Sequence, residues 1–235
     1  MLEQIIALNV LKVGGSLGRR QGLQNLGREI GRLGTQHSLL IVPGGGEFAD
    51  VVRDHYRRYH LDETTAHHMA LLAMDQYGCL LGDLIPHSVL VTDLLLARRE
   101  AASGRTPILL PSSLLIYADP LPHSWQITSD AIAAWIAMLV HASRFILLKD
   151  VDGLFSTDPT QDNLARLHSK MPVKELVNHH GGIDDYMAIV LGATDVDTWV
   201  INGQHPERLT QLFQAGQTHG THITHEPERS EQTEG

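Results

Sequence analysis

The feature that most constrains the fold is an alternation, along almost the whole chain, between short apolar segments and amphipathic helical segments. Several apolar segments have no polar face, as expected of strands buried on both sides of a parallel sheet. Strands that alternate with helices predict an α/β fold in which helices cover both faces of the sheet. The expected strands are 8–13, 39–42, 89–92, 107–110, 145–149 and 198–202.

The helical segments repeat apolar residues every three or four positions. One stripe consists of Leu23, Leu26, Ile30 and Leu33. Gly34 follows this stripe and is expected at the C′ position, where a left-handed backbone ends a helix. Thr128 or Ser129 is expected to cap a helix over 130–141. Further helices are expected to begin at Glu47 and to cover 66–84 and 205–215.

The 235 residues, 43% of them apolar, suffice for the core of one large domain, which we expect over 1–224. The polar, acidic segment 225–235 is expected to be a disordered tail. A formal net charge of -9 without a basic block argues against a nucleic-acid partner.

Several features predict a cytoplasmic protein with no membrane partner. The single Cys79 cannot form an internal disulfide, and the N-terminal segment has no basic region or cleavage site of a signal peptide. The longest plain apolar run, 131–140, is about half the length of a bilayer span. The histidine-rich segment 219–225 lacks acidic or cysteine companions at ligand spacing, so no metal site is predicted.

A first glycine turn, LKVGGSLG, follows the first expected strand. Lys12 lies near the end of that strand, and Gly14, Gly15 and Ser16 come next. Glycine lets the backbone approach a phosphate closely, and the free N–H groups of such a turn attract anions. The spacing matches neither the Walker A motif nor the dinucleotide fingerprint. The alternative is a tight strand-to-helix turn with a surface lysine.

A second glycine turn, in IVPGGGEFADVVR, follows the second expected strand. The consecutive Gly44, Gly45 and Gly46 predict another anion cradle, because a purely structural loop seldom needs three residues that are costly to order. Arg53 in the following helix could bind an acceptor phosphate through two hydrogen bonds. The alternative for Arg53 is a solvated helix face.

A third cluster combines HSWQITSDAIAAW with FILLKDVDGLFSTDP. Asp130 opens a helix, where it either caps the helix or anchors lysine ammonium groups around a phosphoryl group. Lys149 ends a strand and is followed by Asp150, Asp152 and Gly153. The alternative there is a β-turn with solvated charges.

In this order, the lysine-glycine turn, the triple glycine, the Ser-Asp pair before a helix and the KDVDGLF stretch resemble the amino acid kinase superfamily. The resemblance covers the chain from Leu8 to about Thr224. It implies a three-layer αβα sandwich with a mostly parallel central sheet, and a homo-oligomer. It also implies a kinase that uses ATP and Mg²⁺ to phosphorylate a small anionic acceptor. The acceptor side would lie in the N-terminal half and the nucleotide side in the C-terminal half.

The resemblance also implies roles for individual residues. Lys12, Asp130 and Lys149 would be catalytic, with Asp130 orienting the lysine that contacts the transferred phosphoryl group. Gly14, Gly15, Gly45 and Gly46 would supply backbone donors. The acceptor would be bound by Gly44, Gly45, Gly46, Arg53 and His67, with His67 favoured over His68. The nucleotide would be bound by Gly14, Gly15, Ser16, Asp150, Asp152, Gly153, Phe155, Asn202 and Gly203.

A narrower resemblance, to the phosphate kinases of methanofuran biosynthesis, rests on four stretches: PGGGEFADVVR, AHHMALLAMDQYG, HSWQITSD and INGQHPERL. It implies a furfuryl-type phosphate monoester as acceptor and a diphosphate as product. The chain departs from the superfamily in one respect. Members of the superfamily usually have a second catalytic lysine late in the chain, but the corresponding stretch here, 186–197, contains no lysine. Either Lys149 supplies the second charge, or turnover is slow, or the protein binds nucleotide without turnover.

Two alternatives to that acceptor stay open. The same fold could phosphorylate uridylate, isopentenyl phosphate or an amino-acid carboxylate. A chain without the late lysine could instead be a nucleotide-binding storage or sensor protein, similar to the molybdenum storage proteins in its K-D-x-D-G-L stretch.

Overall fold

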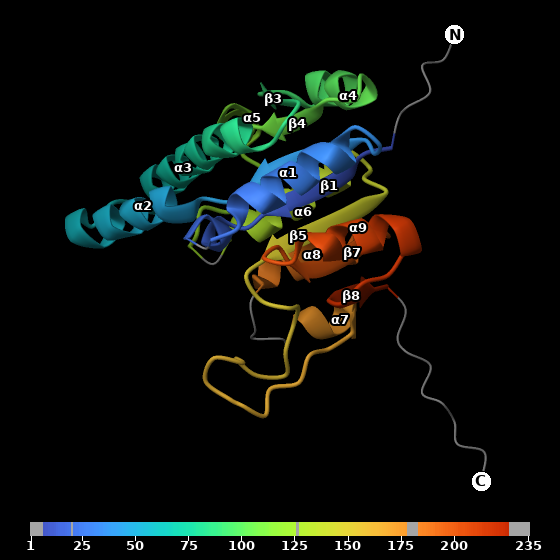
Figure 1. Ribbon diagram of the computed structural model, residues 1–235. Helices are drawn as coiled ribbons and strands as arrows, with labels where there is room; N and C mark the ends of the chain where they lie inside the picture. The colour runs from blue at the N-terminus through green and yellow to red at the C-terminus, as the bar shows by residue number, and fades with distance from the viewer. Residues whose placement is uncertain (1–6, 20, 126, 178–182, 226–235) are drawn as a thin grey trace.

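The computed structural model describes residues 7–19, 21–125, 127–177 and 183–225 (Figure 1). Eight strands of the described residues form one sheet in the order β3-β4-β2-β1-β5-β7-β8-β6. The strands are β1 (Asn9–Val13), β2 (Leu39–Pro43), β3 (Ser88–Val91), β4 (Thr106–Leu109), β5 (Arg144–Lys149), β6 (Lys170–Pro172), β7 (Asp197–Asn202) and β8 (Thr221–Thr224).

The sheet is parallel except where β8 pairs antiparallel with β7. β1 pairs in parallel with β2 on one side and with β5 on the other, although β5 comes much later in the chain. The strand order therefore reverses direction at β1. Such a switch point opens a crevice at the carboxyl ends of the strands, where ligands of open α/β sheets bind.

Helices cover both faces of this sheet, and the helices are α1 (Leu23–Gly34), α2 (Gly46–Tyr59), α3 (Glu63–Leu84), α4 (Leu94–Ala102), α5 (Ser112–Ala118), α6 (Ser129–Leu139), α7 (Val173–Leu176), α8 (Asp185–Gly192) and α9 (Pro206–Ala215). α1 and α9 lie over one face, where Leu26 and Leu212 pack with Ile146 of β5 (Figure 1). α6 and α8 cover the other face, where Ile136 and Leu191 pack with Phe145. This arrangement confirms the predicted three-layer αβα sandwich.

The predicted strands and helices agree with the structure except at a few positions. β6 and β8 and helices α4, α5, α7 and α8 were not predicted. Gly34 is the last residue of α1, not a left-handed C′ residue. Its lack of a side chain has another reason, because a Cβ atom there would lie 1.9 Å from Thr106 Oγ1.

The predicted tail falls almost entirely outside the described residues. Among the described helices, none is both long and apolar enough to cross a membrane.

Candidate active site

Strand geometry brings Lys12 and Lys149 to the same face of the sheet. Side chains alternate between the two faces of a strand. Val10 on β1 and Leu147 on β5 belong to the core under α6, so Lys12 and Lys149, each two residues further on, point to the same side. Both lysines lie near the carboxyl ends of neighbouring parallel strands, beside the N-terminus of α6.

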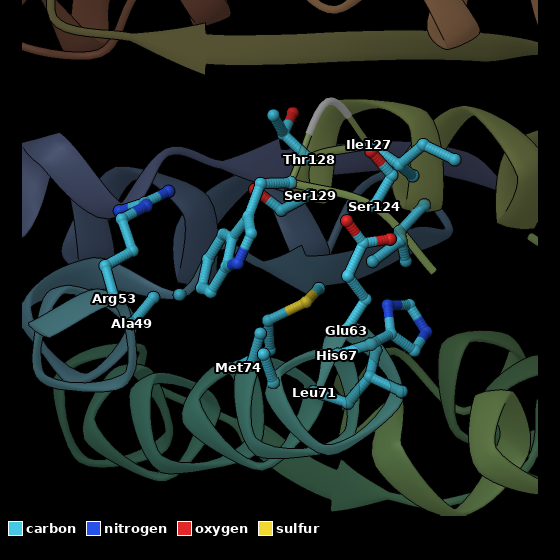
Figure 2. Close-up of a pocket in the computed structure, with 15 residues that line it drawn as sticks. Ala49, Arg53, Glu63, His67, Leu71, Met74, Ser124, Ile127, Thr128 and Ser129 are labelled. Carbon is cyan, nitrogen blue, oxygen red and sulfur yellow. The ribbon is translucent and has the colours of Figure 1, made fainter. Parts of the chain in front are cut away.

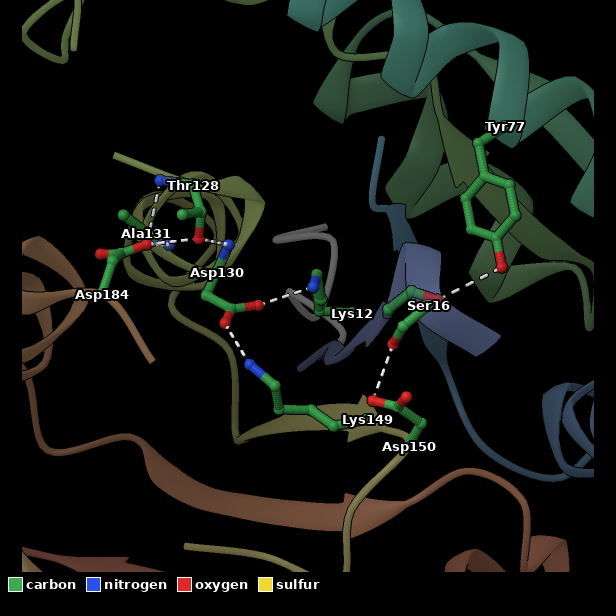
Figure 3. A network of polar contacts seen from close by, with 10 residues as sticks. Lys12, Ser16, Tyr77, Thr128, Asp130, Ala131, Lys149, Asp150 and Asp184 are labelled. Carbon is green, nitrogen blue, oxygen red and sulfur yellow. Dashed lines mark hydrogen bonds and ion pairs between the residues drawn. The ribbon is translucent and has the colours of Figure 1, made fainter. Parts of the chain in front are cut away.

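Asp130, in the first turn of α6, binds both lysines (Figure 3). Its Oδ1 lies 2.6 Å from Lys12 Nζ and its Oδ2 lies 2.6 Å from Lys149 Nζ. Asp130 is 3% exposed and Lys12 is 5% exposed, so these charges face each other in a desolvated setting. Burial alone would raise the pKa of Asp130, but the two lysines outweigh burial and hold the pKa well below its ordinary value.

Burial lowers the pKa of Lys12, and Lys149 lowers it further, while Asp130 acts in the opposite direction. The ion pair therefore opposes the effect of burial on this lysine. The structure thus brings together the three residues predicted as catalytic.

A second buried carboxylate, Asp184, holds the N-terminus of α6 in place (Figure 3). Its Oδ2 accepts hydrogen bonds from Thr128 N, Thr128 Oγ1 and Ala131 N, at 3.0, 2.6 and 3.2 Å. Its Oδ1 accepts one from Met187 N at 2.7 Å, which caps α8. Burial raises the pKa of Asp184. One side chain therefore fixes α6 against α8 beside Asp130.

The two glycine turns pack backbone against backbone. A Cβ atom on Gly15 would lie 2.2 Å from Gly46 N, and one on Gly44 would lie 2.7 Å from Gly15 N. Gly46 also has a left-handed backbone, with φ 57°. Tyr77 of α3 supports the pair, because its hydroxyl donates to Gly14 O at 3.3 Å. Side chains at these positions would force the loops apart.

Only part of the predicted set of backbone donors is available. Gly14 N already donates to Leu148 O at 2.8 Å, so the prediction that Gly14 donates to a phosphate is wrong. Gly44 N likewise donates to Val13 O at 2.9 Å. Within the described residues, no such bond is made by the N–H groups of Gly15, Gly45 and Gly46. Gly45 and Gly46 begin α2, so its N-terminal dipole adds to the attraction for an anion.

These elements surround a charged cavity of about 420 Å³. Four basic residues line it: Lys12, Arg19, Arg53 and Lys149. Three acidic residues also line it: Asp50, Asp130 and Asp184. Lys12 and both glycine turns thus open onto one shared space, together with the N-termini of α2 and α6. The cavity can hold a multiply charged anion.

An apolar pocket of about 80 Å³ adjoins the charged cavity (Figure 2). Its walls include Leu71, Met74, Trp125 and Ile132. The residues that line both spaces are Gly45, Ala49, Arg53, Thr128 and Ser129. A ligand with an apolar body and an anionic end can therefore lie across the boundary.

Arg53 stands at that boundary and is held in place from two sides. Its Nη1 lies 2.9 Å from Asp50 Oδ1, and its guanidinium carbon lies 5.3 Å from the centre of the Trp125 ring. Arg19 also pairs with Asp50. The structure therefore places Arg53 on the cavity wall, away from a purely solvated helix face.

His67 lines the apolar pocket, whereas His68 does not. The ring of His67 stacks on His123 with 4.5 Å between centroids. Burial lowers the pKa of His67, and His123 lowers it further. A neutral imidazole in an apolar wall is placed to contact the body of an acceptor more readily than its phosphate.

The predicted nucleotide-side residues form a second polar network next to the cavity. Ser16 Oγ donates to Asp150 Oδ1 at 2.9 Å. Asp152 accepts from Asn202 Nδ2 at 2.9 Å and pairs with Arg208 Nη1 at 2.6 Å. Of the predicted nucleotide residues, only Gly14, Gly15 and Ser16 line the charged cavity.

Gly153, Phe155 and Gly203 have mainly structural contacts in the described residues. A Cβ atom on Gly153, whose φ is 151°, would lie 2.5 Å from Thr221 Oγ1. Phe155 forms an isolated bridge with Leu167. A Cβ atom on Gly203 would lie 2.7 Å from Leu17 Cδ1. The close packing explains both glycines without a ligand.

The donor set suits a Mg²⁺ ion that arrives on nucleotide phosphates. Within the described ranges, no three His, Cys, Asp or Glu side chains converge as a metal cage. Asp130 is already bound by two lysines, and Asp184 by backbone N–H groups. Mg²⁺ commonly uses few protein carboxylates and keeps substrate phosphates and water as ligands.

The sequence did not identify Arg19, Asp184, Glu63 and Trp125 as site residues. Asp184 is 56 residues from Thr128 in the chain, and only the packing of α8 against α6 brings them together. A signal for Arg19 was present, because it closely follows the first glycine turn.

A switch-point crevice with paired lysines and two glycine turns defines a phosphoryl-transfer enzyme of the α/β class. The sequence model of the Amino acid kinase family matches residues 7–194, and the chain belongs to that family. It is accordingly an ATP-dependent kinase.

Two curated relatives have related activities. The chain is 30% identical over 212 residues to [5-(aminomethyl)furan-3-yl]methyl phosphate kinase of Methanocaldococcus jannaschii, with 88% of this chain and 93% of the relative covered. It is 24% identical to uridylate kinase of Methanosarcina barkeri, covering 77% and 79% of the two chains. The crystal structure of uridylate kinase from Archaeoglobus fulgidus shares the fold, with TM-score 0.73, 23% identity and coverage of 92% and 100%.

Proposed function

We propose that the chain phosphorylates [5-(aminomethyl)furan-3-yl]methyl phosphate to the corresponding diphosphate. The observation that carries the proposal is the small apolar pocket that opens into a cavity lined by Lys12, Lys149 and the glycine turns. An aromatic ring with a phosphate on a short arm matches this pair of spaces. The relative of Methanocaldococcus jannaschii, named for that substrate, supports the same choice.

The size of the apolar pocket favours this acceptor over a nucleotide. The pocket is small, about 80 Å³, and the aminomethylfuranylmethyl group, with about eight non-hydrogen atoms, would fit it more easily than uridine, with about seventeen. A nucleoside would require the pocket to open. Isopentenyl phosphate is small enough to fit the apolar pocket, but it has no polar group that could contact Glu63, which also lines this pocket.

The reaction depends on positive charge and correct positioning more than on general acid–base catalysis. An oxygen of the acceptor phosphate, ionised at neutral pH, attacks the γ-phosphorus of ATP, and the bond to the β,γ-bridging oxygen breaks so that ADP leaves with its electrons. Lys12 and Lys149 face the transferred phosphoryl group, while Gly15, Gly45 and Gly46 donate backbone N–H groups. Arg53 holds the acceptor phosphate at the boundary of the two spaces. Mg²⁺ would neutralise further charge on the nucleotide phosphates.

Lys149 takes the place of the late lysine of the superfamily in this proposal. Stretch 186–197 offers no lysine, whereas Lys149 lies 2.6 Å from the same carboxylate that holds Lys12. In the proposed complex, Ser16, Asp150, Asp152, Gly153, Phe155, Asn202 and Gly203 lie on the nucleotide side.

The test is steady-state ADP release with purified protein, ATP and Mg²⁺, using four acceptors: the aminomethylfuran phosphate, uridylate, isopentenyl phosphate and acetylglutamate. We expect the aminomethylfuran phosphate to give the highest kcat/KM. A higher value for another acceptor would replace the substrate in this proposal. ATP binding without ADP release from any acceptor would favour the storage or sensor alternative.

A further inference from the structure

The far end of the apolar pocket contains a carboxylate that phosphoryl transfer does not use. Glu63 is the first residue of α3 and lines the apolar pocket, but it does not line the charged cavity. Tyr77 on the same helix contacts the glycine turns, so Glu63 lies toward the opposite end of α3. Figure 2 shows its carboxylate directed into the pocket beside His67.

Helix capping does not account for this carboxylate. Asp62 caps α3, accepting from Thr65 N at 3.0 Å and from Thr65 Oγ1 at 2.6 Å. Within the described residues, no hydrogen bond or ion pair reaches the Glu63 carboxylate. Among the described residues that line the apolar pocket, Glu63 is also the only acidic one.

A carboxylate beside an apolar wall favours ligands that carry a positive charge. Glu63 is exposed at the edge of the pocket, and Leu71, Met74 and Ile132 cannot solvate a negative charge, so a ligand that fills the pocket removes part of the water around its carboxylate. A neutral ligand would leave the charge uncompensated, whereas a ligand with an ammonium group would pair with it. Arg53 lines the side of the pocket that adjoins the charged cavity, so the pocket carries one positive and one negative side chain.

We propose that Glu63 binds a primary ammonium group of the acceptor and selects acceptors that carry an amine at one end and a phosphate at the other. This inference rests on the proposed function, because it assumes that the acceptor phosphate lies in the charged cavity. It assigns to Glu63 a role in specificity and none in the chemical step.

The experiment compares two acceptors that differ only in the amine: [5-(aminomethyl)furan-3-yl]methyl phosphate and (5-methylfuran-3-yl)methyl phosphate. We expect the unaltered protein to prefer the amine by about tenfold or more in kcat/KM, mainly through KM. Glu63→Gln should lower kcat/KM for the amine by about tenfold and leave the methyl analogue within about twofold. Glu63→Asp should retain part of the preference.

The matched control is Glu207→Gln. Glu207 is also exposed and lies in the first turn of a helix, α9, but it lines neither space. Glu207→Gln should leave kcat/KM for both acceptors unchanged. This control separates recognition of the amine from a general effect of removing a charge near a helix N-terminus.

Two outcomes would overturn the assignment: equal kcat/KM for both acceptors in the unaltered protein, or equal losses for both in Glu63→Gln. Calorimetric binding of both acceptors, without nucleotide, measures the preference independently of turnover. If calorimetry shows the amine preference but no ADP is released, the proposed reaction fails while the role of Glu63 stands.

Discussion

Lys12 is buried and pairs with Asp130. Lys12→Ala should lower kcat by two to three orders of magnitude, because one well-placed donor to a transition state is worth about 3–4 kcal/mol. The measurement is ADP release at saturating acceptor, with circular dichroism to show that the fold is retained. Lys174→Ala, at an exposed position of α7, is the control. A loss smaller than tenfold would remove Lys12 from the mechanism.

Asp130 should matter for stability as well as for activity. Asp130→Asn removes the carboxylate that pairs with both ammonium groups, so the free energy of unfolding should fall by about 3–5 kcal/mol. Adding Lys12→Met should cost less than the sum of the two single changes, because it removes one of the repelling charges. Urea unfolding of the three variants measures both effects. Strict additivity would contradict the coupling.

At the residue scale, the sequence was informative where a motif was local. Lys12, Asp130 and Lys149 were predicted from short motifs, and the structure brings them within hydrogen-bond distance. Asp184 and Glu63 gave no such signal, because their importance depends on helices that pack from distant parts of the chain. The prediction for Gly14 failed because a strand-end hydrogen bond to Leu148 had already taken its N–H group.

The close approach of the two glycine turns makes a prediction for an element. Gly15→Ala places a Cβ atom 2.2 Å from Gly46 N, and backbone cannot yield as a flexible side chain can. We expect the loops to separate and kcat/KM to fall by at least tenfold, since phosphoryl transfer depends on exact positions. Kinetics and urea unfolding measured together report both effects.

Gly192→Ala is the control for this substitution. Gly192 lies at the end of α8, and a Cβ atom there meets only Val173 at 3.8 Å, an ordinary contact. The Gly192→Ala variant should keep the kcat/KM of the unaltered protein. If Gly15→Ala were equally harmless, the glycines would not be needed for close packing.

The N-terminus of α6 depends on Asp184. Asp184→Ala leaves donors at Thr128, Ala131 and Met187 without their acceptor, and each orphaned buried donor costs about 1–3 kcal/mol. Asp93→Ala removes an N-cap of α4 that accepts from Leu96 N, and should cost only about 1 kcal/mol. Denaturant unfolding should therefore show a clearly larger loss for Asp184→Ala. Similar losses would contradict a bridging role.

At the element scale, long segments with a clear period were predicted, and short ones were not. β6 and β8 contain 3 and 4 residues, too few for a periodic pattern to be distinguished from a loop. Gly34 follows an apolar stripe, as a C′ glycine does, but its close approach to Thr106 on β4 explains why this residue is a glycine. Such a contact depends on which strands become neighbours, which local patterns do not specify.

At the scale of the whole molecule, Asp197 ties β7 to strands on either side. It pairs with Arg144 of β5 at 2.6 Å and with His222 of β8 at 3.0 Å. Burial would raise the pKa of Asp197, but His222 and Arg144 outweigh it and lower the pKa from 3.8 to about 2. A carboxyl whose pKa is lower in the folded state stabilises the fold above its unfolded pKa.

The contribution of Asp197 should therefore be complete above about pH 4 and should be lost as the pH falls toward 2. In Asp197→Asn, the free energy of unfolding should decline less steeply over this window than in the unaltered protein. Urea unfolding between pH 2 and 6 measures the slopes. Asp54→Asn, at a side chain 80% exposed, should leave the slope unchanged. Equal slopes for Asp197→Asn and the unaltered protein would contradict the assignment.

The position of Asp130 between two ammonium groups has a consequence for the timing of catalysis. Because one buried carboxylate holds both cations, their mutual repulsion is overcome once, when the chain folds. In the proposed reaction, an arriving phosphoryl group would meet fixed charges that need no rearrangement of side chains or solvent. The site is preorganised, and the free energy that a flexible site would spend on ordering in every cycle is already contained in the native structure.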